Sequence, residues 1–407
     1  MSADYIPFVS TEKDCEILKK FYPDPMRIRV SLEKRDQIAD RLPPAANLWL
    51  DGAVDGIHIW DPEEVRSKIK KKEKTRLKQY HDYIMHFPGC EKIRDSNFQK
   101  RPDYEVVKEF VRSVMDKCCD DGSRNPDWLS IPQLPMVKNN SRNKINQSLA
   151  EAAGKWRADN SFTGKMILPV ILTHQDQVHL KKGRKGPLSE VERCYKLAGA
   201  AGVWVTETSL NDQEGSKPLS TKRFPGLIQF HQELNELLPD AITVAGPYWG
   251  MNLVLWARGL VRYPAISLGT AYKYYIPGVS FPSGSAHAAI PPLKRWVAVS
   301  REFQTWLKES LPRIPRQERA YAELEALLRG FQVRGFDKEY WRTQVAKFYK
   351  DWLNELTAVP TSGRALALYQ QLSSAYVLGR SLRPLPPDEK SAKRPEKVAE
   401  QLMLSCL

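Results

Sequence analysis

The strongest constraint on the fold is a regular alternation of helical segments and short apolar strands. Five predicted helices, at 104–117, 143–157, 189–200, 224–238 and 251–262, precede strands at 128–131, 166–172, 203–206, 242–245 and 265–268. A further strand at 48–50 comes before them. Continuously apolar strands separated by helices are typical of parallel strands joined by helical crossovers. The chain therefore belongs to the α/β class.

The strand count favours a TIM-like (β/α)8-type barrel, complete or irregular, over a doubly wound sheet. We expect a lead-in at 1–46, a barrel at 47–300 that carries a basic insertion at 61–87, a helical C-terminal region at 301–380 and a mobile tail at 381–407. The segment 296–299 fits either a seventh strand or the start of a helix. No glycine-rich nucleotide-binding motif follows any strand, so we expect no cofactor.

The overall composition restricts the class of binding partner that we expect. The 407-residue chain carries a net charge of +14 and contains 11 Trp and 16 Tyr. It has no apolar run long enough to cross a membrane and no signal-peptide pattern, which predicts a cytoplasmic protein without a membrane partner. Its cysteines lack zinc-site spacing, so we expect no metal. Basic charge combined with aromatic residues favours a nucleic-acid partner, although a basic pI also serves solubility.

The most basic stretch follows the first strand. Asp61-Pro62-Glu63-Glu64 has the composition of a helix start. The residues that we expect to contact DNA phosphates come next: Lys70, Lys71, Lys72, Lys74 and Arg76. A solvated helix face is the alternative interpretation. Such a charge density favours a helix that tracks phosphates.

Polar side chains gather where the predicted strands end, which is where barrel enzymes place their chemistry. The candidate catalytic residues are Asp51 and Glu207, and the candidate substrate-binding residues are Asp55, Gln133, His174, Tyr248, Trp249, Tyr272 and Lys273. Asp51 ends an apolar strand and is followed by Gly52, a residue suited to a sharp turn. Asp55 is about 13 Å further along a regular strand, so the two acids meet only if Gly52 turns the chain.

Each of these residues also has a structural interpretation. A solvated loop acid is the alternative for Asp51, Glu207 and, more strongly, Asp55. His174 fits a base or a hydrogen-bonded barrel histidine. Tyr248 and Trp249 fit an aromatic wall for a planar ligand or core packing. Gln133 has the amide that reads a base edge.

Carboxylates, aromatic rings, amides and basic surface together suit N-glycosidic chemistry on a nucleic acid. Such an enzyme flips a nucleotide out of the duplex and stacks its base on an aromatic ring. A carboxylate then stabilises, or attacks, the positive charge that develops at the sugar C1′ atom. No Gly-x-Ser-x-Gly elbow is present, which argues against a serine hydrolase.

The segment Leu48-Trp49-Leu50-Asp51-Gly52-Ala53 resembles the barrel motif of the tRNA-guanine transglycosylase superfamily and its DNA-acting DpdA-type paralogues. In that family an Asp-Ser-Gly sequence sets a carboxylate against the exchanged base. The resemblance extends over residues 45 to 290 by strand order, and it implies a catalytic role for Asp51. The serine is absent here, and so is the family's cysteine/histidine zinc site. Both departures argue against base exchange on tRNA.

The chain resembles most closely the antiviral bacterial DNA glycosylases related to this superfamily. The resemblance implies excision of glucosylated hydroxymethylcytosine from double-stranded phage DNA, which leaves an abasic site. We expect no obligate protein partner. A base-exchanging transglycosylase and a non-catalytic nucleic-acid-binding barrel are the alternatives. The partner of Asp51 is expected on another strand, with Glu207 as the first candidate.

Overall fold

The computed structural model describes residues 5–22, 27–57, 71–95, 102–119, 125–136, 140–172, 187–208, 210, 223–268, 274, 286–385 and 394–406. Within these ranges the side chains of 71–77, 95, 140–142 and 223 are not described.

Eight parallel strands form a closed barrel in chain order, which confirms the predicted fold class. The strands are β1 (Ile6–Val9), β2 (Arg27–Ser31), β3 (Asn47–Asp51), β4 (Trp128–Ser130), β5 (Lys165–Leu172), β6 (Gly202–Glu207), β7 (Ile242–Ala245) and β8 (Tyr263–Ser267). β8 pairs in parallel with β1 and closes the ring. Because all strands run the same way, their carboxyl ends meet at one mouth of the barrel.

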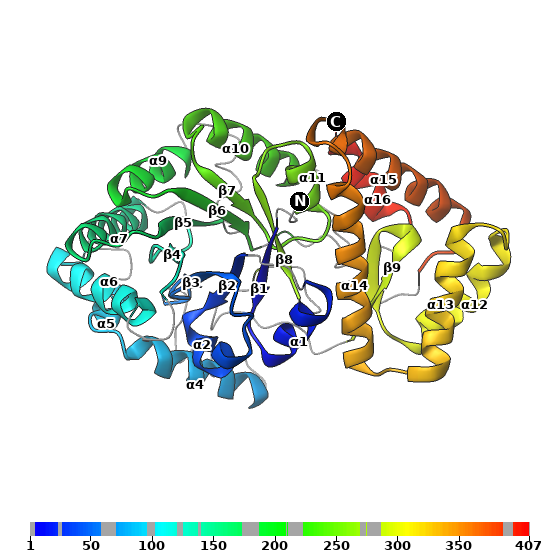
Figure 1. Cartoon of the computed structure of the whole chain (residues 1–407), viewed down its shortest axis with the longest axis horizontal. Helices are drawn as coiled ribbons and strands as arrows, with labels where there is room; N and C mark the ends of the chain where they lie inside the picture. The colour runs from blue at the N-terminus through cyan, green and yellow to red at the C-terminus, as the bar shows by residue number, and fades with distance from the viewer. Residues whose placement is uncertain are drawn as a thin grey trace.

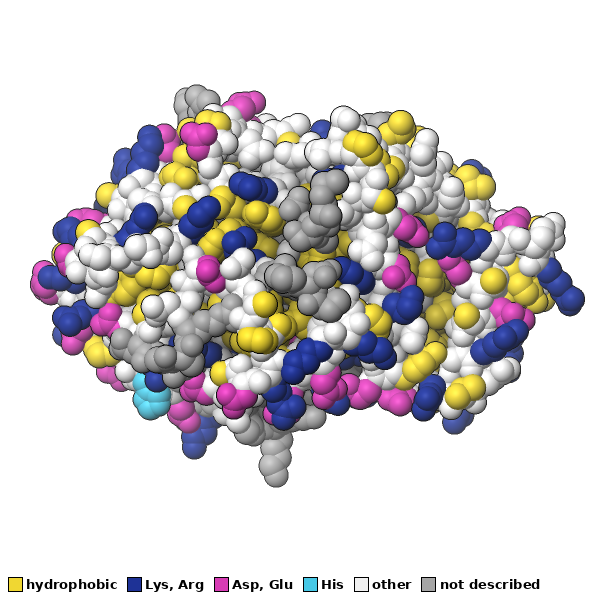
Figure 2. Space-filling view, in the orientation of Figure 1, with side chains coloured by type: hydrophobic (Ala, Val, Ile, Leu, Met, Phe, Trp, Pro, Cys, Tyr) yellow, Lys and Arg dark blue, Asp and Glu magenta, His cyan; other side chains and the backbone are white. Residues whose placement is uncertain are grey.

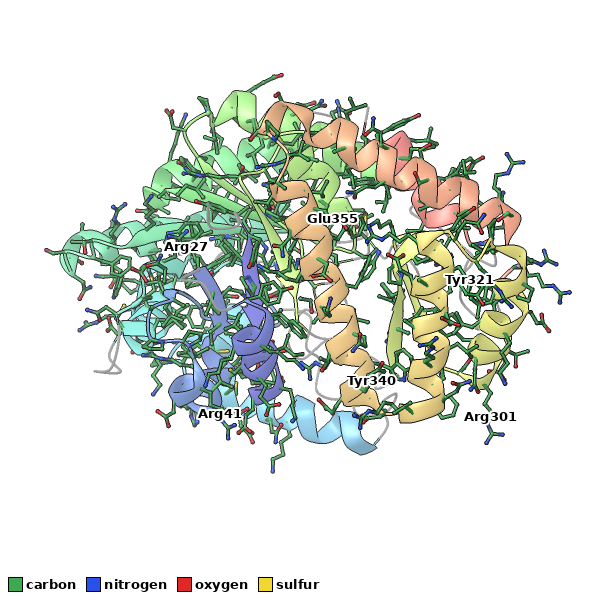
Figure 3. All side chains as sticks on the ribbon, turned by 45° about the vertical axis from the view of Figure 1, so that its right-hand side comes forward. Arg27, Arg41, Arg301, Tyr321, Tyr340 and Glu355 are labelled. Atoms are coloured by element: carbon green, nitrogen blue, oxygen red, sulfur yellow. The ribbon has the colours of Figure 1, made fainter. Side chains whose placement is uncertain are left out.

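The prediction that residues 1–46 form only a lead-in is wrong, because this segment supplies β1 and β2. These strands are 4 and 5 residues long. The inward positions of β2 are occupied by Arg27 and Arg29, so the segment lacks the continuous apolar run that marks a parallel strand. Both arginines point at aromatic rings inside the barrel, and Figure 3 labels Arg27 there.

Helices surround the strands (Figure 1). They are α1 (Glu12–Phe21), α2 (Leu32–Ile38), α4 (Lys71–Met85), α5 (Cys90–Asp95), α6 (Tyr104–Cys119), α7 (Asn140–Asp159), α9 (Pro187–Ala198), α10 (Arg223–Leu237) and α11 (Met251–Ala257). Thr11 and Asp14 form a capping box that fixes the start of α1. The outward side chains of the strands and the inward faces of the helices share one large apolar core.

The chain then forms a C-terminal module beside the barrel (Figure 1). It contains β9 (His287–Ile290), β10 (Arg295–Ala298), α12 (Arg301–Ser310), α13 (Arg319–Arg334), α14 (Lys338–Thr357) and α15 (Arg364–Ser381). β10 pairs antiparallel with β9, so the segment 296–299 contributes no seventh barrel strand. A second apolar core fills this module.

Helix α14 belongs to the barrel as much as to the module. Its Arg342 pairs with Asp14 at the start of α1 and donates to the carbonyl of Leu268 just after β8. Its Tyr349 hydroxyl donates to Asn252 Oδ1 in α11 at 2.7 Å. α14 thus lies between α11 and α1, where the helix that follows β8 completes the outer ring of a (β/α)8 barrel.

The prediction of a mobile tail at 381–407 is wrong for its last part, which forms α16 (Lys397–Leu404). Val398 and Leu402 of this helix are buried in the barrel core. A Cβ placed on Gly250 would lie 2.6 Å from Leu402 Cδ1, so α16 packs directly on the loop after β7. The composition around it, rich in proline and charge, concealed a short apolar helix. In the described part of the chain, no helix combines the length and apolar character that a membrane crossing requires.

We expect Leu402→Ala to lower the free energy of unfolding by about 2–5 kcal/mol, because Leu402 is 0% exposed and its loss leaves a cavity. The matched control is Leu404→Ala on the same helix, where the side chain is 67% exposed. The control should change stability by less than about 0.5 kcal/mol. Urea unfolding measures the free energy of unfolding of both variants. If Leu402→Ala lowers it no more than Leu404→Ala does, Leu402 does not contribute to the core.

Candidate active site

The interior of the barrel is filled by aromatic rings. Strand alternation turns Phe8, Trp49, Trp128 and Trp204 inward, and all four belong to one buried cluster. The ring centroids of Phe8 and Trp204 are 5.3 Å apart, and those of Trp49 and Trp204 are 5.6 Å apart. The Trp49 indole N–H donates to Ser130 Oγ at 2.9 Å. These contacts form a rigid floor beneath the carboxyl ends of the strands.

Arg29 and Asp51 form a buried ion pair on this floor. The guanidinium carbon of Arg29 is 4.6 Å from the centre of the Phe8 ring and 4.9 Å from that of Trp204. Burial works against the charge of Arg29, but the field of Asp51 and neighbouring groups raises its pKa overall. Asp51 shares the inward side of β3 with Trp49, so its carboxylate is fixed at the mouth of the barrel.

The chain turns sharply after Asp51, which brings Asp55 back to the same place. Ala53 has a φ of 52°, a left-handed conformation that strains a non-glycine residue. The Ala53 N–H donates to Asp51 Oδ1 at 3.3 Å. Tyr80 of α4 donates to the carbonyl of Ala53 and accepts the N–H of Gly56. The sharp turn after Asp51, which is needed to bring Asp55 close to Asp51, is therefore present, and Tyr80 of α4 stabilises it.

Asp55 is buried and has an unusual acidity. Loss of solvation and the nearby charge of Asp51 raise its pKa from 3.8 to about 7. The hydroxyl of Tyr274 donates to Asp55 Oδ2 at 3.0 Å, which works in the opposite direction. Tyr274 also packs edge-on against Trp204, with ring centroids 5.0 Å apart. Asp55 thus carries a proton that it can release near neutral pH.

A small cavity lies between these groups at the mouth of the barrel. Its volume is about 10 Å³, and its lining includes Asp51, Asp55, Gln133, Pro169, Trp204 and Tyr274. This space corresponds to about one water molecule. Three of the lining residues, Asp51, Asp55 and Gln133, were candidates from the sequence. The other three, Pro169, Trp204 and Tyr274, were not.

Gln133 lies at the cavity with its amide already engaged. Its side-chain N–H groups donate to the carbonyls of Pro132 at 2.8 Å and Asn146 at 3.1 Å. These bonds fix the orientation of the amide and leave its carbonyl oxygen as the group that can face a ligand. Any reading of a base edge by Gln133 is limited to accepting a hydrogen bond.

Glu207 is not the partner of Asp51, because Arg29 takes that place. Glu207 ends β6 and is buried, but it does not line the cavity. It lies three positions after Trp204, and side chains alternate along a strand, so it projects to the opposite side of β6. Its backbone N–H donates to the Tyr248 hydroxyl at 2.6 Å.

Tyr248 and Trp249 form no aromatic wall at the cavity. Both side chains are 0% exposed. Trp249 stacks on Phe348 of α14 with ring centroids 5.8 Å apart, and its indole N–H donates to the carbonyl of Lys294. The loop after β7 turns outward at this point, so these rings join the barrel to α14. Core packing, the alternative interpretation, is the correct one for this pair.

Several candidates fall outside the described part of the chain. These are His174, Tyr272, Lys273 and Lys70. Lys71, Lys72, Lys74 and Arg76 lie in the first turns of α4, for which only the backbone is described. The predicted phosphate contacts therefore stay predictions.

Sequence reasoning missed Arg29, Trp204 and Tyr274. Trp204 had a readable signal, because it alternates with apolar residues in a strand that the sequence predicts. Arg29 lacked such a signal, because its strand was itself not predicted. Tyr274 had no signal either, since Tyr272 and Tyr275 lie beside it in the sequence and only the fold distinguishes them. Among the residues whose side chains are described, no group of three or more His, Cys, Asp and Glu suits a metal ion.

Comparisons with known proteins add little to this geometry. No family model matches the sequence, and no curated protein matches it. The chain is similar to a solved structure, the enoyl reductase domain of MlnA from the macrolactin biosynthesis cluster of Bacillus amyloliquefaciens, with 10% sequence identity and a TM-score of 0.26. The match covers 99% of this chain and 93% of that chain. So weak a likeness supports no functional argument, and the site is interpreted only from its own geometry.

We expect the contribution of Asp55 to stability to fall as the pH rises from about 4 to about 7, while buried His231, whose pKa is lowered to about 3 by loss of solvation, makes a contribution of opposite sign. In that window folded Asp55 keeps a proton that the unfolded chain has released, because its pKa rises from 3.8 to about 7 on folding. The full effect is at most about 4 kcal/mol. Urea unfolding across the window measures it.

Asp55→Asn should remove this contribution, so the stability of the variant should rise relative to that of the wild type as the pH rises through the window. Asp36→Asn, at an exposed position of α2, should leave it unchanged. A wild-type slope in Asp55→Asn would contradict the assignment of the raised pKa to Asp55.

Proposed function

We propose that this protein is a DNA glycosylase that hydrolyses the N-glycosidic bond of a base and leaves an abasic site. The observation that carries the proposal is a pair of buried carboxyl groups in unlike states at one cavity. Asp51 is ion-paired with Arg29, whereas Asp55 has a pKa of about 7. Two carboxyl groups with separate charge states are what glycoside cleavage requires.

The two acids take different roles in this reaction. Asp55 gives its proton to the leaving base as the bond between C1′ and the base nitrogen breaks, and the bonding electrons leave with the base. Asp51 stabilises the positive charge that develops at C1′, or attacks that carbon. Water then adds at C1′ and its proton returns to a carboxylate. Arg29 pairs with Asp51 and holds it in position throughout.

The surroundings of the cavity suit a nucleotide. Trp204 and Tyr274 offer aromatic surface, and Gln133 offers a fixed carbonyl oxygen. α4, which holds the loop of Asp55 through Tyr80, begins with the lysine-rich stretch, and Lys71 lies about 14 Å along the helix axis from Tyr80. Phosphates bound at the start of α4 would thus lie within reach of the barrel mouth.

On the face in Figure 2, Lys and Arg side chains are scattered among Asp and Glu and form no single uniform patch. The net charge of +14 still favours association with a polyanion. The proposed substrate is double-stranded DNA that carries glucosylated hydroxymethylcytosine, as in phage DNA, and the proposed setting is antiviral defence in the cytoplasm. This part of the proposal derives from the resemblance of the Asp51 segment.

In its closed state the cavity has a volume of about 10 Å³, which accommodates about one water molecule beside the two carboxyl groups. A nucleotide enters only when side chains that close the cavity, such as Tyr274, move aside. The proposal therefore includes a local opening at the barrel mouth on binding.

A base-release assay tests the proposal. Purified protein is incubated with duplex DNA that contains cytosine or glucosylated hydroxymethylcytosine, and released bases are identified by mass spectrometry. Asp51→Asn should reduce release by about 100-fold or more, because the charge at C1′ loses its stabilisation. Glu207→Gln, at the same end of the barrel but outside the cavity, should stay close to wild type.

Other outcomes separate the alternatives. Incorporation of a supplied free base would identify a transglycosylase. DNA binding that survives Asp51→Asn, with no product from the wild type on either substrate, would identify a non-catalytic barrel.

The pH profile tests the proton donor. We expect the rate of base release to decline above a pH of about 7, where Asp55 loses its proton. Tyr274→Phe should move this decline to higher pH, since the Tyr274 hydrogen bond lowers the pKa of Asp55. A decline that stays in place in Tyr274→Phe would contradict the role of Asp55.

A further inference from the structure

A large cleft lies in the C-terminal module, away from the barrel cavity. It has a volume of about 890 Å³ and lies between α13, α14, α15 and the short 3-10 helix η4 (Pro291–Leu293). That volume is in the range of small-molecule sites. Figure 2 shows apolar side chains between α14 and α13 with acidic and basic ones around them, and Figure 3 labels Glu355 on α14. Nothing in the proposed DNA chemistry uses this cleft.

Lys294 is the reactive group that the cleft presents. It follows Pro291-Pro292-Leu293 with a φ of 51°, and its carbonyl accepts the indole N–H of Trp249. The fold therefore fixes its backbone firmly. Its side chain is 12% exposed, and its Nζ lies 5.4 Å from the centre of the Phe348 ring and 5.3 Å from that of Trp352. The amine thus lies over an aromatic wall and still lines the cleft.

Charged groups on two neighbouring helices face this amine. Glu355 of α14 has its Oε2 3.5 Å from Lys294 Nζ, and Glu323 and Arg319 of α13 act from further away. Loss of solvation outweighs the attraction of the two glutamates and lowers the pKa of Lys294. A larger share of this amine is therefore neutral, and hence nucleophilic, than in an exposed lysine.

We propose that this cleft is a second ligand site, in which Lys294 forms an imine with a neutral aldehyde. The neutral amine attacks the carbonyl carbon, a C–N bond forms, and the amine proton passes to the carbonyl oxygen. Water then leaves and the C=N bond remains. Glu355 accepts and returns the proton, so the step needs no oxidant or reductant.

The charges of the cleft select the ligand class. Its lining holds three bases and four acids: Lys294, Arg319, Lys347, Glu318, Glu323, Asp351 and Glu355. Arg319 is already paired with Glu323 and Glu355, and Lys347 with Asp351. When Lys294 is neutral, two negative charges are in excess, which disfavours an anionic ligand in a protein that is basic as a whole.

Reductive trapping tests the proposal. The full-length protein is incubated with propanal and sodium cyanoborohydride, and alkylation of every lysine is quantified by peptide mass spectrometry. Lys294 should react about tenfold faster than Lys347, the matched lysine of the same cleft, although the side chain of Lys347 is 54% exposed. Glyoxylate, an aldehyde of similar size with a negative charge, should abolish this preference.

Glu355→Gln provides a readout that a purely structural lysine would not change. Removing a charge that raises the pKa of Lys294 should move its pH–rate profile to lower pH and leave that of Lys347 in place. Lys294→Arg should lose the fast-reacting site, with thermal unfolding as the check on folding. The proposal is overturned if Lys294 reacts no faster than Lys347, or if its profile does not move in Glu355→Gln.

Discussion

The buried ion pair between Arg29 and Asp51 is the interaction on which the proposed active site depends. Both side chains lie inside the barrel, where a lone charge is strongly unfavourable and removal of one partner destabilises by about 3–5 kcal/mol. The pair forms only if β2 and β3 keep the register that sets Arg29 beside Trp49 and Ser31 beside Asp51. The rings of Phe8 and Trp204 flank the guanidinium and exclude water from it. The same contact thus fixes both the fold and the position of Asp51, whose charge adds to the loss of solvation that raises the pKa of Asp55.

Periodicity in the sequence predicted the parts of the fold that are regular. Six strands and the helices between them follow from apolar runs, because outward strand positions and inward helix faces share one core. β1 and β2 were not predicted, because they are short and because Arg27 and Arg29 occupy positions of β2 where an apolar residue is expected. Inward arginines become intelligible only once the aromatic rings of distant strands surround them. That information is absent from a local window.

The site was predicted in part for related reasons. Asp51 is predictable from the sequence because an acid at the end of an apolar strand rarely serves core packing. Its link to Asp55 required a turn in which Ala53 takes a left-handed conformation, which sequence alone does not favour for alanine. The error at Glu207 was avoidable, since three steps along a strand reverse the side-chain direction. Tyr248 and Trp249 lie in a loop with two flanking glycines, but the surface they meet belongs to α14, about 100 residues further along the chain.

The position of α14 also governs the order in which the molecule can be completed. The barrel strands end at Ser267, yet the helix that closes the outer ring begins at Lys338, after the two-stranded ribbon, α12 and α13. During synthesis, the outer apolar face of β8 and β1 would therefore stay uncovered until about 70 further residues have been made and α14 can pack on it. The ribbon, α12 and α13 are thus an insertion between β8 and α14, the strand and helix of the last βα unit. Because α14 contributes side chains to both apolar cores, a cut between Ser267 and Lys338 would separate the barrel from a helix that packs against it.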